Sequence, residues 1–485
     1  MKKILVLLLS VSIAFSMVIV ADGCGKGEVE LSKYCIDATY NDGTLECDMT
    51  VNYINNTSSS VNILYFNLYP NAYREGAKIK PVHIEYFSQV YKNGTSYGDI
   101  EIKKVNCDNV KLDYLITGED ENILEVKLNS PVKPNKETSV FIEFTVTLAN
   151  AEHRLGYSEN TVNLTGFYPI LCANYNGDIY KNVYYPSGDP FYSDVANYLV
   201  DLTVPSSYVV ASSLSPTKTE FQGLSTTYSY SRENVRDIAF ILSKNFNVIK
   251  GNLGDVEVSY YYFNDTEPER ALDVIIDSLS YYSKNFCEYP YNEYVVCQAD
   301  FVYGGMEYPC LTFIGGNLTG YDKEYCIAHE TAHQWWYGLV GVNSSEEGFI
   351  DEGLTEYSTI LYLANSDNFN LSKEDLIETV KQSYRQIRDI CVKNQTYKKP
   401  LMKRNLGNFS SDLEYVNIAY YRSQIMFDDL CNFMGEKKFL SAMQGLVNNY
   451  KYKNVSYDTV KRHFNNKKKG ADSILDGYVL GETAI

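Results

Sequence analysis

The first half of the chain alternates hydrophobic and polar residues with a period of two, between short turn sequences. Residues 34–40 and 45–53 alternate in this way on either side of Asn41-Asp42-Gly43, which predicts a β-hairpin. The same alternation predicts further strands at residues 61–68, 123–128, 140–148, 196–204, 225–230 and 237–242. Because no long helical period interrupts them, we predict a β-rich, mostly antiparallel N-terminal domain over residues 25–252.

The pattern changes around residues 251–254, and the second half reads as a mixed domain. Residues 256–263 and 295–298 suit short strands, whereas residues 267–286 follow the helical period. Helices are expected to dominate from about residue 322 onward, at 372–392, 415–434, 437–449 and 456–465. Ser372 and Asp375 open the first of these as a capping pair. We therefore predict an α+β domain over residues 253–485, a small sheet followed by a helical lobe.

The N-terminal segment, residues 1–24, has the composition of an export signal. Two lysines follow Met1, and residues 4–20 form an apolar run. Small residues precede Cys24, which suggests the lipid-modified cysteine of a bacterial lipoprotein. The run is also long enough for an uncleaved membrane anchor. We expect an exported, extracytoplasmic protein that is attached to the membrane through lipidated Cys24, with an uncleaved anchor and free secretion as the alternatives.

The net charge and the cysteine content limit which partners, disulfides and metal sites we expect. The formal net charge is −18, which argues against a nucleic-acid partner. The chain has eleven cysteines, and an exported protein could pair some of them, with Cys35 and Cys47 as the simplest pair. No Cys-x-x-Cys sequence occurs, so we expect no separate cysteine zinc site.

One motif carries most of the chemistry. His329-Glu330-Thr331-Ala332-His333 places two of only five histidines one helical turn apart, so both imidazoles face the same way. Glu352 follows in a second apolar segment, expected to be a helix whose first turn carries it. Two histidines and one carboxylate make the three protein ligands of a catalytic zinc site. We predict one Zn2+ per chain, bound by His329, His333 and Glu352, with Glu330 as the base that takes a proton from water.

Glu356 lies one helical turn beyond Glu352. We expect it on the solvated surface, and the alternative is a hydrogen bond that orients a ligand histidine.

Eighteen residues separate His333 from Glu352. With this spacing, the segments resemble the aminopeptidase N family of gluzincin zinc metallopeptidases, whose ligands are spaced in the same way. Gly305, Met306 and Glu307 lie in a segment that resembles the family's Gly-x-Met-Glu-Asn exopeptidase motif. The resemblance implies that this segment binds substrate and that Glu307 binds its free amino group. Tyr420 falls where the family has a tyrosine that stabilises the transition state, and the adjacent Tyr421 is its rival.

The sequence also departs from the family pattern. Tyr308 stands where the motif has asparagine, and Asp351 stands where the family more often has asparagine. Neither change removes a metal ligand or the base, so we expect the chemistry to be kept and the specificity to differ.

Together these features predict a zinc-dependent metallopeptidase, a hydrolase whose thermolysin-like catalytic domain is C-terminal to the β domain. The exopeptidase motif favours an aminopeptidase that acts on peptides outside the cytosol. Tyr308, which replaces the asparagine of the exopeptidase motif, favours one alternative, a zinc endopeptidase. An inactive peptidase-fold lipoprotein that only binds at the surface is another, but it would have no need for Glu330. The resemblance also implies a third, a different hydrolase activity at the same zinc, such as epoxide opening.

Overall fold

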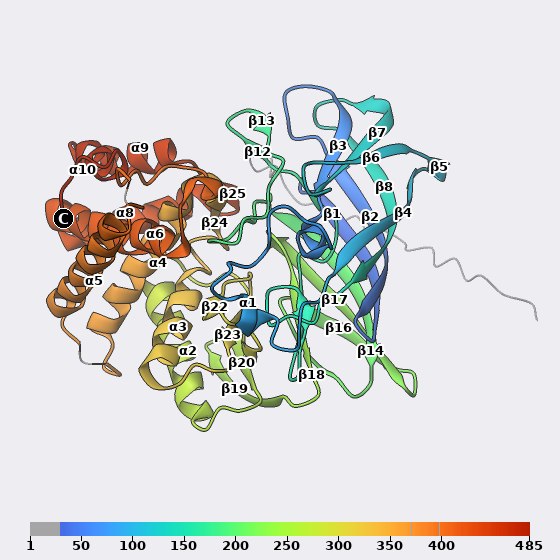
Figure 1. Cartoon of the computed structure of the whole chain (residues 1–485), viewed down its shortest axis with the longest axis horizontal. Coiled ribbons are helices and arrows are strands. Elements are labelled where there is room, and N and C mark those ends of the chain that lie inside the picture. The colour runs from blue at the N-terminus through green and yellow to red at the C-terminus, as the bar shows by residue number, and fades with distance from the viewer. Residues whose placement is uncertain (1–29, 370, 397) are drawn as a thin grey trace, which may run out of the picture. The chain divides into compact units, whose positions relative to one another are not determined.

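A computed structural model describes residues 30–369, 371–396 and 398–485. The predicted signal segment and Cys24 lie outside these residues. Residues 31–485 form one compact unit. In this unit the strands of the first half lie on one side, and the helices of the C-terminal part lie on the other (Figure 1). Within the described part of the chain, no helix combines the length and the apolar character needed to cross a membrane.

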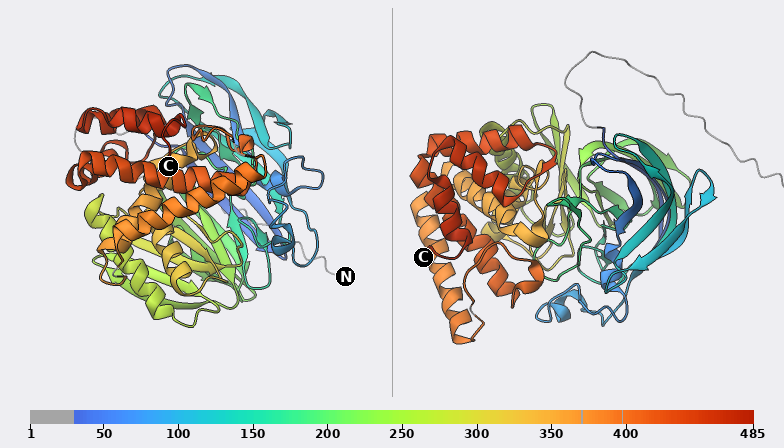
Figure 2. Two further views of the ribbon diagram at one scale, coloured as in Figure 1. Left: turned by 60° about the vertical axis from the view of Figure 1, so that its left-hand side comes forward. Right: turned by 90° about the horizontal axis from the view of Figure 1, so that it is seen from above.

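The largest sheet has eight strands in the order β16-β17-β14-β1-β2-β8-β4-β5. Its predicted hairpin is present, because β1 (Lys33–Asn41) and β2 (Thr44–Ile54) pair antiparallel. Only the β1–β14 pair of this sheet is parallel among the pairs described. The sheet curves strongly when it is seen from above (Figure 2). The other strands are β4 (Asp99–Cys107), β5 (Val110–Lys111), β8 (Glu137–Thr147), β14 (Ala196–Pro205), β16 (Ser215–Phe221) and β17 (Ser225–Val235).

Two four-stranded sheets and a two-stranded ribbon complete the β-rich region, in the orders β15-β18-β10-β9, β11-β3-β7-β6 and β12-β13. These strands are β3 (Val61–Asn67), β6 (Asp113–Thr117), β7 (Ile123–Val132), β9 (Gly156–Tyr157), β10 (Val162–Thr165), β11 (Ile170–Leu171), β12 (Asn174–Tyr175), β13 (Asp178–Ile179), β15 (Val209–Ser212) and β18 (Ala239–Ser243). The helices between them are short, η1 (Tyr69–Tyr73) and α1 (Phe87–Val90). A mostly antiparallel β domain was expected here, and the structure confirms it.

A five-stranded sheet in the order β19-β20-β21-β23-β22 opens the second region. Helix α2 (Pro268–Asn285) lies between its second and third strands along the chain. Helices α3 (Gly320–Ala332) and α4 (Ser344–Asn365) follow the strands, and the three helices pack on one another. The strands are β19 (Asn247–Leu253), β20 (Val256–Tyr262), β21 (Glu293–Ala299), β22 (Gly305–Met306) and β23 (Leu311–Gly315). The expected boundary at residue 252 stays a prediction, and β19, which spans it, pairs with β20.

The C-terminal lobe is helical, as the sequence predicts. Ser372 caps its first helix and accepts a hydrogen bond from the Asp375 amide at 3.2 Å. The expected helix at 415–434 is divided, because a π-helical turn, η3 (Val416–Arg422), interrupts it. The remaining elements are β24 (Val340–Gly341), α5 (Lys373–Lys393), η2 (Leu406–Asn408), α6 (Asp412–Tyr415), α7 (Ser423–Met434), α8 (Glu436–Tyr450), β25 (Lys453–Asn454), α9 (Tyr457–Lys467) and α10 (Ala471–Val479).

Two local predictions are wrong. Cys35 and Cys47 are both free thiols, because the register pairs Cys35 with Thr50 and Cys47 with Ala38. The two cysteines therefore lie on opposite faces of the sheet. Glu352 is not in the first turn of its helix, since α4 already begins at Ser344 and bends at Glu347, where the backbone is non-helical.

Candidate active site

Helices α3 and α4 carry the His-Glu-x-x-His motif and Glu352, and the surrounding core holds both helices rigidly. The Tyr282 hydroxyl donates to the Ala328 carbonyl of α3 at 3.1 Å. The Trp336 indole donates to Ser358 of α4 at 2.9 Å, which ties the end of the motif to the second helix. The three expected ligand side chains therefore come from two packed and buried elements.

The expected ligand atoms converge on one point. Nε2 of His329 and Nε2 of His333 are 3.1 Å apart, and Oε2 of Glu352 lies 3.5 Å from each. Metal–ligand bonds of about 2.0–2.2 Å in a tetrahedron give ligand separations of roughly 3.3–3.6 Å. Oε2 of Glu352 is buried without a hydrogen-bond donor, so a cation supplies the partner that the protein does not. This donor set fits Zn2+.

Each ligand histidine has an oxygen close to its other nitrogen. Nδ1 of His333 lies 2.8 Å from the Trp336 carbonyl and 3.1 Å from Asp351. Nδ1 of His329 lies 3.2 Å from Glu356. Such partners fix the orientation of ligand imidazoles. The expectation of a solvated Glu356 is wrong: its side chain is buried because it faces the histidine instead of water.

Charge at the site shifts the pKa values of its groups. Burial raises the pKa of Glu330 to about 7, helped by Glu352 and opposed by both histidines. Burial also acts to raise the pKa of Glu352, but His329 and His333 outweigh it and lower that pKa to about 2. A carboxyl group with a pKa near neutrality is suited to both accept and release a proton.

The predicted base faces the same cavity as the ligands. Oε2 of Glu330 is buried and has no hydrogen-bond partner. Gly305 lies directly against it, and a methyl group at this glycine would collide with the Glu330 carboxylate. The backbone of the predicted exopeptidase segment can therefore approach the base closely.

Gly305, Met306 and Glu307 form the edge strand β22 and its continuation. The Arg154 guanidinium holds this strand from the β-rich region, with Nε 3.2 Å from the Met306 sulfur. Glu307 is 3% exposed, lines the cavity, and has one carboxylate oxygen without a partner. Burial, followed by the charge of Asp189, raises its pKa well above the usual range. Tyr308 does not line the cavity, and its ring stacks on Phe313.

Tyr420 and Tyr421 differ clearly in position. Tyr420 lines the cavity and donates a hydrogen bond to Glu352. Tyr421 follows it on the π-helical turn η3, is half-buried, and is not among the lining residues. The geometry favours Tyr420 for the predicted role, which itself stays a prediction.

The cavity holds about 270 Å³ and is strongly acidic. Arg154 and Asp189, which the sequence did not indicate, come from the β-rich region and form an ion pair of 2.6 Å in its wall. Tyr415 was not foreseen either, and its buried hydroxyl has no partner. The lining contains six carboxylates against one arginine: Asp189, Glu307, Glu330, Glu352, Glu356, Asp412 and Arg154.

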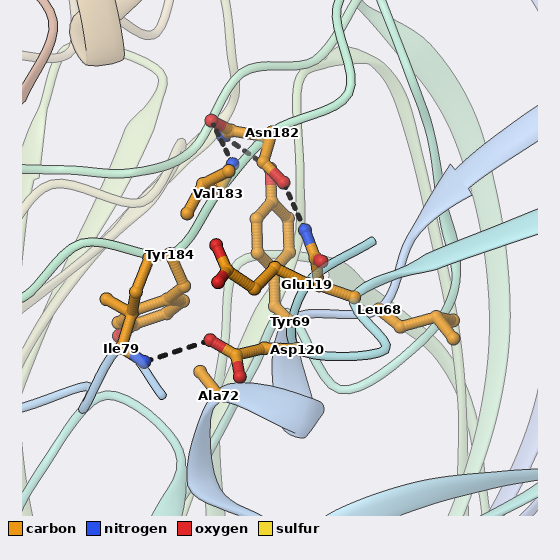
Figure 3. A pocket seen from close by; sticks show the side chains of 10 residues that line it. Leu68, Tyr69, Ala72, Ile79, Glu119, Asp120, Asn182, Val183 and Tyr184 are labelled. Atoms are coloured by element: carbon orange, nitrogen blue, oxygen red, sulfur yellow. Dashed lines mark hydrogen bonds between the residues drawn. The ribbon is translucent and has the colours of Figure 1, made fainter. Parts of the chain in front are cut away.

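A smaller pocket lies within the β-rich region (Figure 3). Asp120 fixes one wall by accepting hydrogen bonds from the backbone amides of Lys78 and Ile79. At about 20 Å³ it has room for one water molecule and is too small for a substrate.

Residues 270–478 match the family model described as Peptidase family M1 domain. Among curated proteins, human aminopeptidase B (Homo sapiens) is 27% identical over 228 residues, which is 44% of this chain and 34% of that protein. Leukotriene A-4 hydrolase of Xenopus laevis is 33% identical over 106 residues, or 21% of this chain and 16% of that protein. The chain thus spans about a third or less of the length of these relatives.

Solved structures share the fold over nearly the whole chain. An M1 zinc metallopeptidase variant from Deinococcus radiodurans, bound to a Tyr-Ser-Ala substrate, has a TM-score of 0.66 at 14% identity and covers 94% of this chain and 95% of that one. A two-domain M1 zinc metallopeptidase variant bound to L-arginine has a TM-score of 0.68 at 15% identity, with 94% of both chains covered. The ligand spacing and the predicted exopeptidase segment agree with the match of residues 270–478 to the Peptidase family M1 domain, so this part of the chain is similar to aminopeptidase N-like gluzincin metallopeptidases.

Proposed function

We propose that this protein is a zinc-dependent aminopeptidase that releases N-terminal residues from peptides. One observation carries the proposal: the metal ligands, the unpartnered carboxylate of Glu330 and the unpartnered carboxylate of Glu307 face one cavity. The aminopeptidase relatives and the structural neighbour with a bound tripeptide support the same activity. When bound by His329, His333 and Glu352, Zn2+ supplies a Lewis acid that polarises the peptide carbonyl and acidifies water.

Glu330 moves the proton. Its carboxylate accepts a proton from the attacking water and delivers it to the leaving nitrogen, so that one water is consumed for each peptide bond broken. A pKa of about 7 makes both transfers feasible without a large energy cost in either direction.

Tyr420 stabilises the developing oxyanion. Its hydroxyl already points at the metal ligand Glu352, so a small movement of the phenol reaches an oxygen beside that ligand. One such donor contributes about 3 kcal/mol to lowering the barrier.

Glu307 fixes the register of the peptide. A buried carboxylate without a partner is costly, and the ammonium group of a peptide N-terminus provides the missing charge-assisted hydrogen bond. Gly305 and Met306 carry this carboxylate on the edge strand beside Glu330. The scissile bond is therefore held one residue from the N-terminus.

A substrate panel with a base variant tests the proposal. Unblocked amino-acid amides and peptides should be hydrolysed, chelator should abolish the activity, and N-acetylated peptides should resist. Glu330→Gln should keep one zinc per chain by elemental analysis and lose at least about 100-fold in kcat. Rapid cleavage of acetylated peptides, or appreciable turnover by Glu330→Gln, would contradict the assignment.

We further propose that the protein is exported and held at the outer side of the membrane through lipidated Cys24. The basic start, the apolar run and the small residues before Cys24 support this. Labelling with a fatty-acid analogue tests it, because Cys24→Ser should lose the label. Label retained by that variant would contradict the attachment site.

A further inference from the structure

We infer that the cavity has a second cation site, in which a divalent metal ion bridges Glu307 and Glu330. The site is distinct from the three-ligand site, although it lies beside it. Its occupation blocks the amino group of the substrate, and this consequence rests on the proposed aminopeptidase function.

The ligand geometry of the second site is present in the structure. Three potential ligand atoms, one each from Glu307, Glu330 and His333, all lie within 4.8 Å of one another. The ligand atoms of the first site lie within the same distance of one another. All three side chains are buried. Oε1 of Glu307 and Oε2 of Glu330 have no hydrogen-bond partner, so each offers a free lone pair inside the cavity.

The negative charge of the cavity favours a cation between Glu307 and Glu330. Two carboxyl groups that face each other in a buried site cannot both stay ionised unless a positive charge lies between them. Arg154 is the cation among the lining residues, but it is engaged by Asp189 at 2.6 Å and by the Gly188 carbonyl at 3.0 Å. Arg154 therefore does not pair with the two glutamates, and the ligand histidines are the remaining positive groups beside them.

The second site is weaker than the first. Nε2 of His333 already faces His329 and Glu352, and Nδ1 lies against the Trp336 carbonyl. With the first ion in place, the second rests on two carboxylates and water. Carboxylate oxygens suit Mn2+ and also accept Zn2+, whereas the two imidazoles make the first site more selective for zinc. We expect the second Zn2+ to bind about tenfold or more weakly than the first.

An ion at this site inhibits in two ways. It occupies Glu307, which the substrate ammonium requires, and it withdraws the Glu330 lone pair, which the attacking water requires. Inhibition by excess metal is therefore competitive with an unblocked peptide, and high substrate concentration reverses it.

Metal stoichiometry tests the site independently of activity. Protein loaded with one zinc per chain is dialysed against rising Zn2+, and bound metal is measured by elemental analysis. Wild type should bind a second equivalent, and Glu307→Gln should keep the first equivalent and lose the second. Glu257→Gln, which removes a carboxylate paired with Lys250 outside the cavity, is the matched control and should bind both. An unblocked amino-acid amide should displace the second equivalent, and its N-acetyl form should not.

Kinetics complete the test. Rising Zn2+ should increase the apparent KM for an amino-acid arylamide without lowering kcat. The inference is overturned if wild type does not bind a second equivalent of zinc. It is also overturned if Glu307→Gln binds the second equivalent as well as wild type does. If the one-zinc protein is inactive on every unblocked peptide but the second equivalent depends on Glu307, the site stands and the proposed function fails.

Discussion

The hydroxyl of Tyr420 donates a hydrogen bond of 2.6 Å to Oε1 of the metal ligand Glu352. The Tyr420 ring also lies nearly parallel to the His329 imidazole, with centroids 6.1 Å apart. The π-helical turn η3 therefore brings this tyrosine over the metal site, although it comes from the C-terminal lobe. The contact links the proposed oxyanion donor directly to the ligand set.

Tyr420→Phe should lower kcat by roughly 100- to 1000-fold, because it removes the oxyanion donor and keeps the ring. Bound zinc should stay at one per chain, since Glu352 keeps Oε2 for the metal. Tyr421→Phe is the matched control and should change kcat by less than about threefold. Steady-state kinetics with elemental analysis measures both, and a larger loss in Tyr421→Phe would reverse the assignment.

Glu356→Gln should weaken zinc binding by about 10- to 100-fold, because His329 loses the charged partner that orients its ring and increases its basicity. Competition with a chelator of known affinity measures the change. The exposed Glu288 provides the control variant Glu288→Gln, which should bind zinc as wild type does. Unchanged zinc affinity in Glu356→Gln would mean that the contact has no part in metal binding.

Periodicity and spacing predicted much of this structure. The alternation at 34–40 and 45–53 predicts the two strands of the hairpin, because alternation places the apolar residues of each strand on one face, which must be buried. The i, i+4 spacing of His329 and His333 fixes two ligands because it is a local property of any helix. Resemblance to a family, and not periodicity, supplied Glu307 and Tyr420.

The rest depends on tertiary packing. Asp189 and Arg154 reach the cavity from a region whose sequence shows only strands and turns. The polar face of α4 gave no indication whether Glu356 meets water or a buried histidine, because amphipathic patterns are the same for both. The offset between Cys35 and Cys47 could be known only once the register of β1 on β2 was known.

Arg236 should be essential for stability, because it joins the β-rich region to the turn that follows α3. Its guanidinium is fully buried and donates to the carbonyls of Tyr337 at 2.6 Å, Ser193 at 3.2 Å and Lys453 at 3.0 Å. Arg236→Met removes the donor of all three hydrogen bonds, although the Ser193 carbonyl keeps one from Asn454, and should cost roughly 3 kcal/mol or more in the free energy of unfolding. Urea unfolding measures the loss. Arg232→Met, which removes a buried arginine paired with Glu293, is the comparison, and equal or smaller loss in Arg236→Met would contradict the role.

Asp237 should make the protein less stable as the pH rises from about 4 to about 6. Burial raises the pKa of this carboxyl to about 6, although the Tyr337 hydroxyl, 2.6 Å away, and Arg236 oppose the shift. The unfolded chain has an ordinary aspartate pKa of about 4. Between these values the folded protein holds a proton that the unfolded chain has lost, so raising the pH favours unfolding.

Asp237→Asn removes this titration and keeps an acceptor for the Tyr337 hydroxyl. Relative to the variant, wild type should lose up to about 3 kcal/mol of unfolding free energy between pH 4 and pH 6.5, and no more above that range, since the carboxyl is then ionised in both states. Urea unfolding of both proteins across this range measures the difference. Parallel pH profiles would show that Asp237 titrates alike in the folded and unfolded chain, and that burial at this position does not raise its pKa.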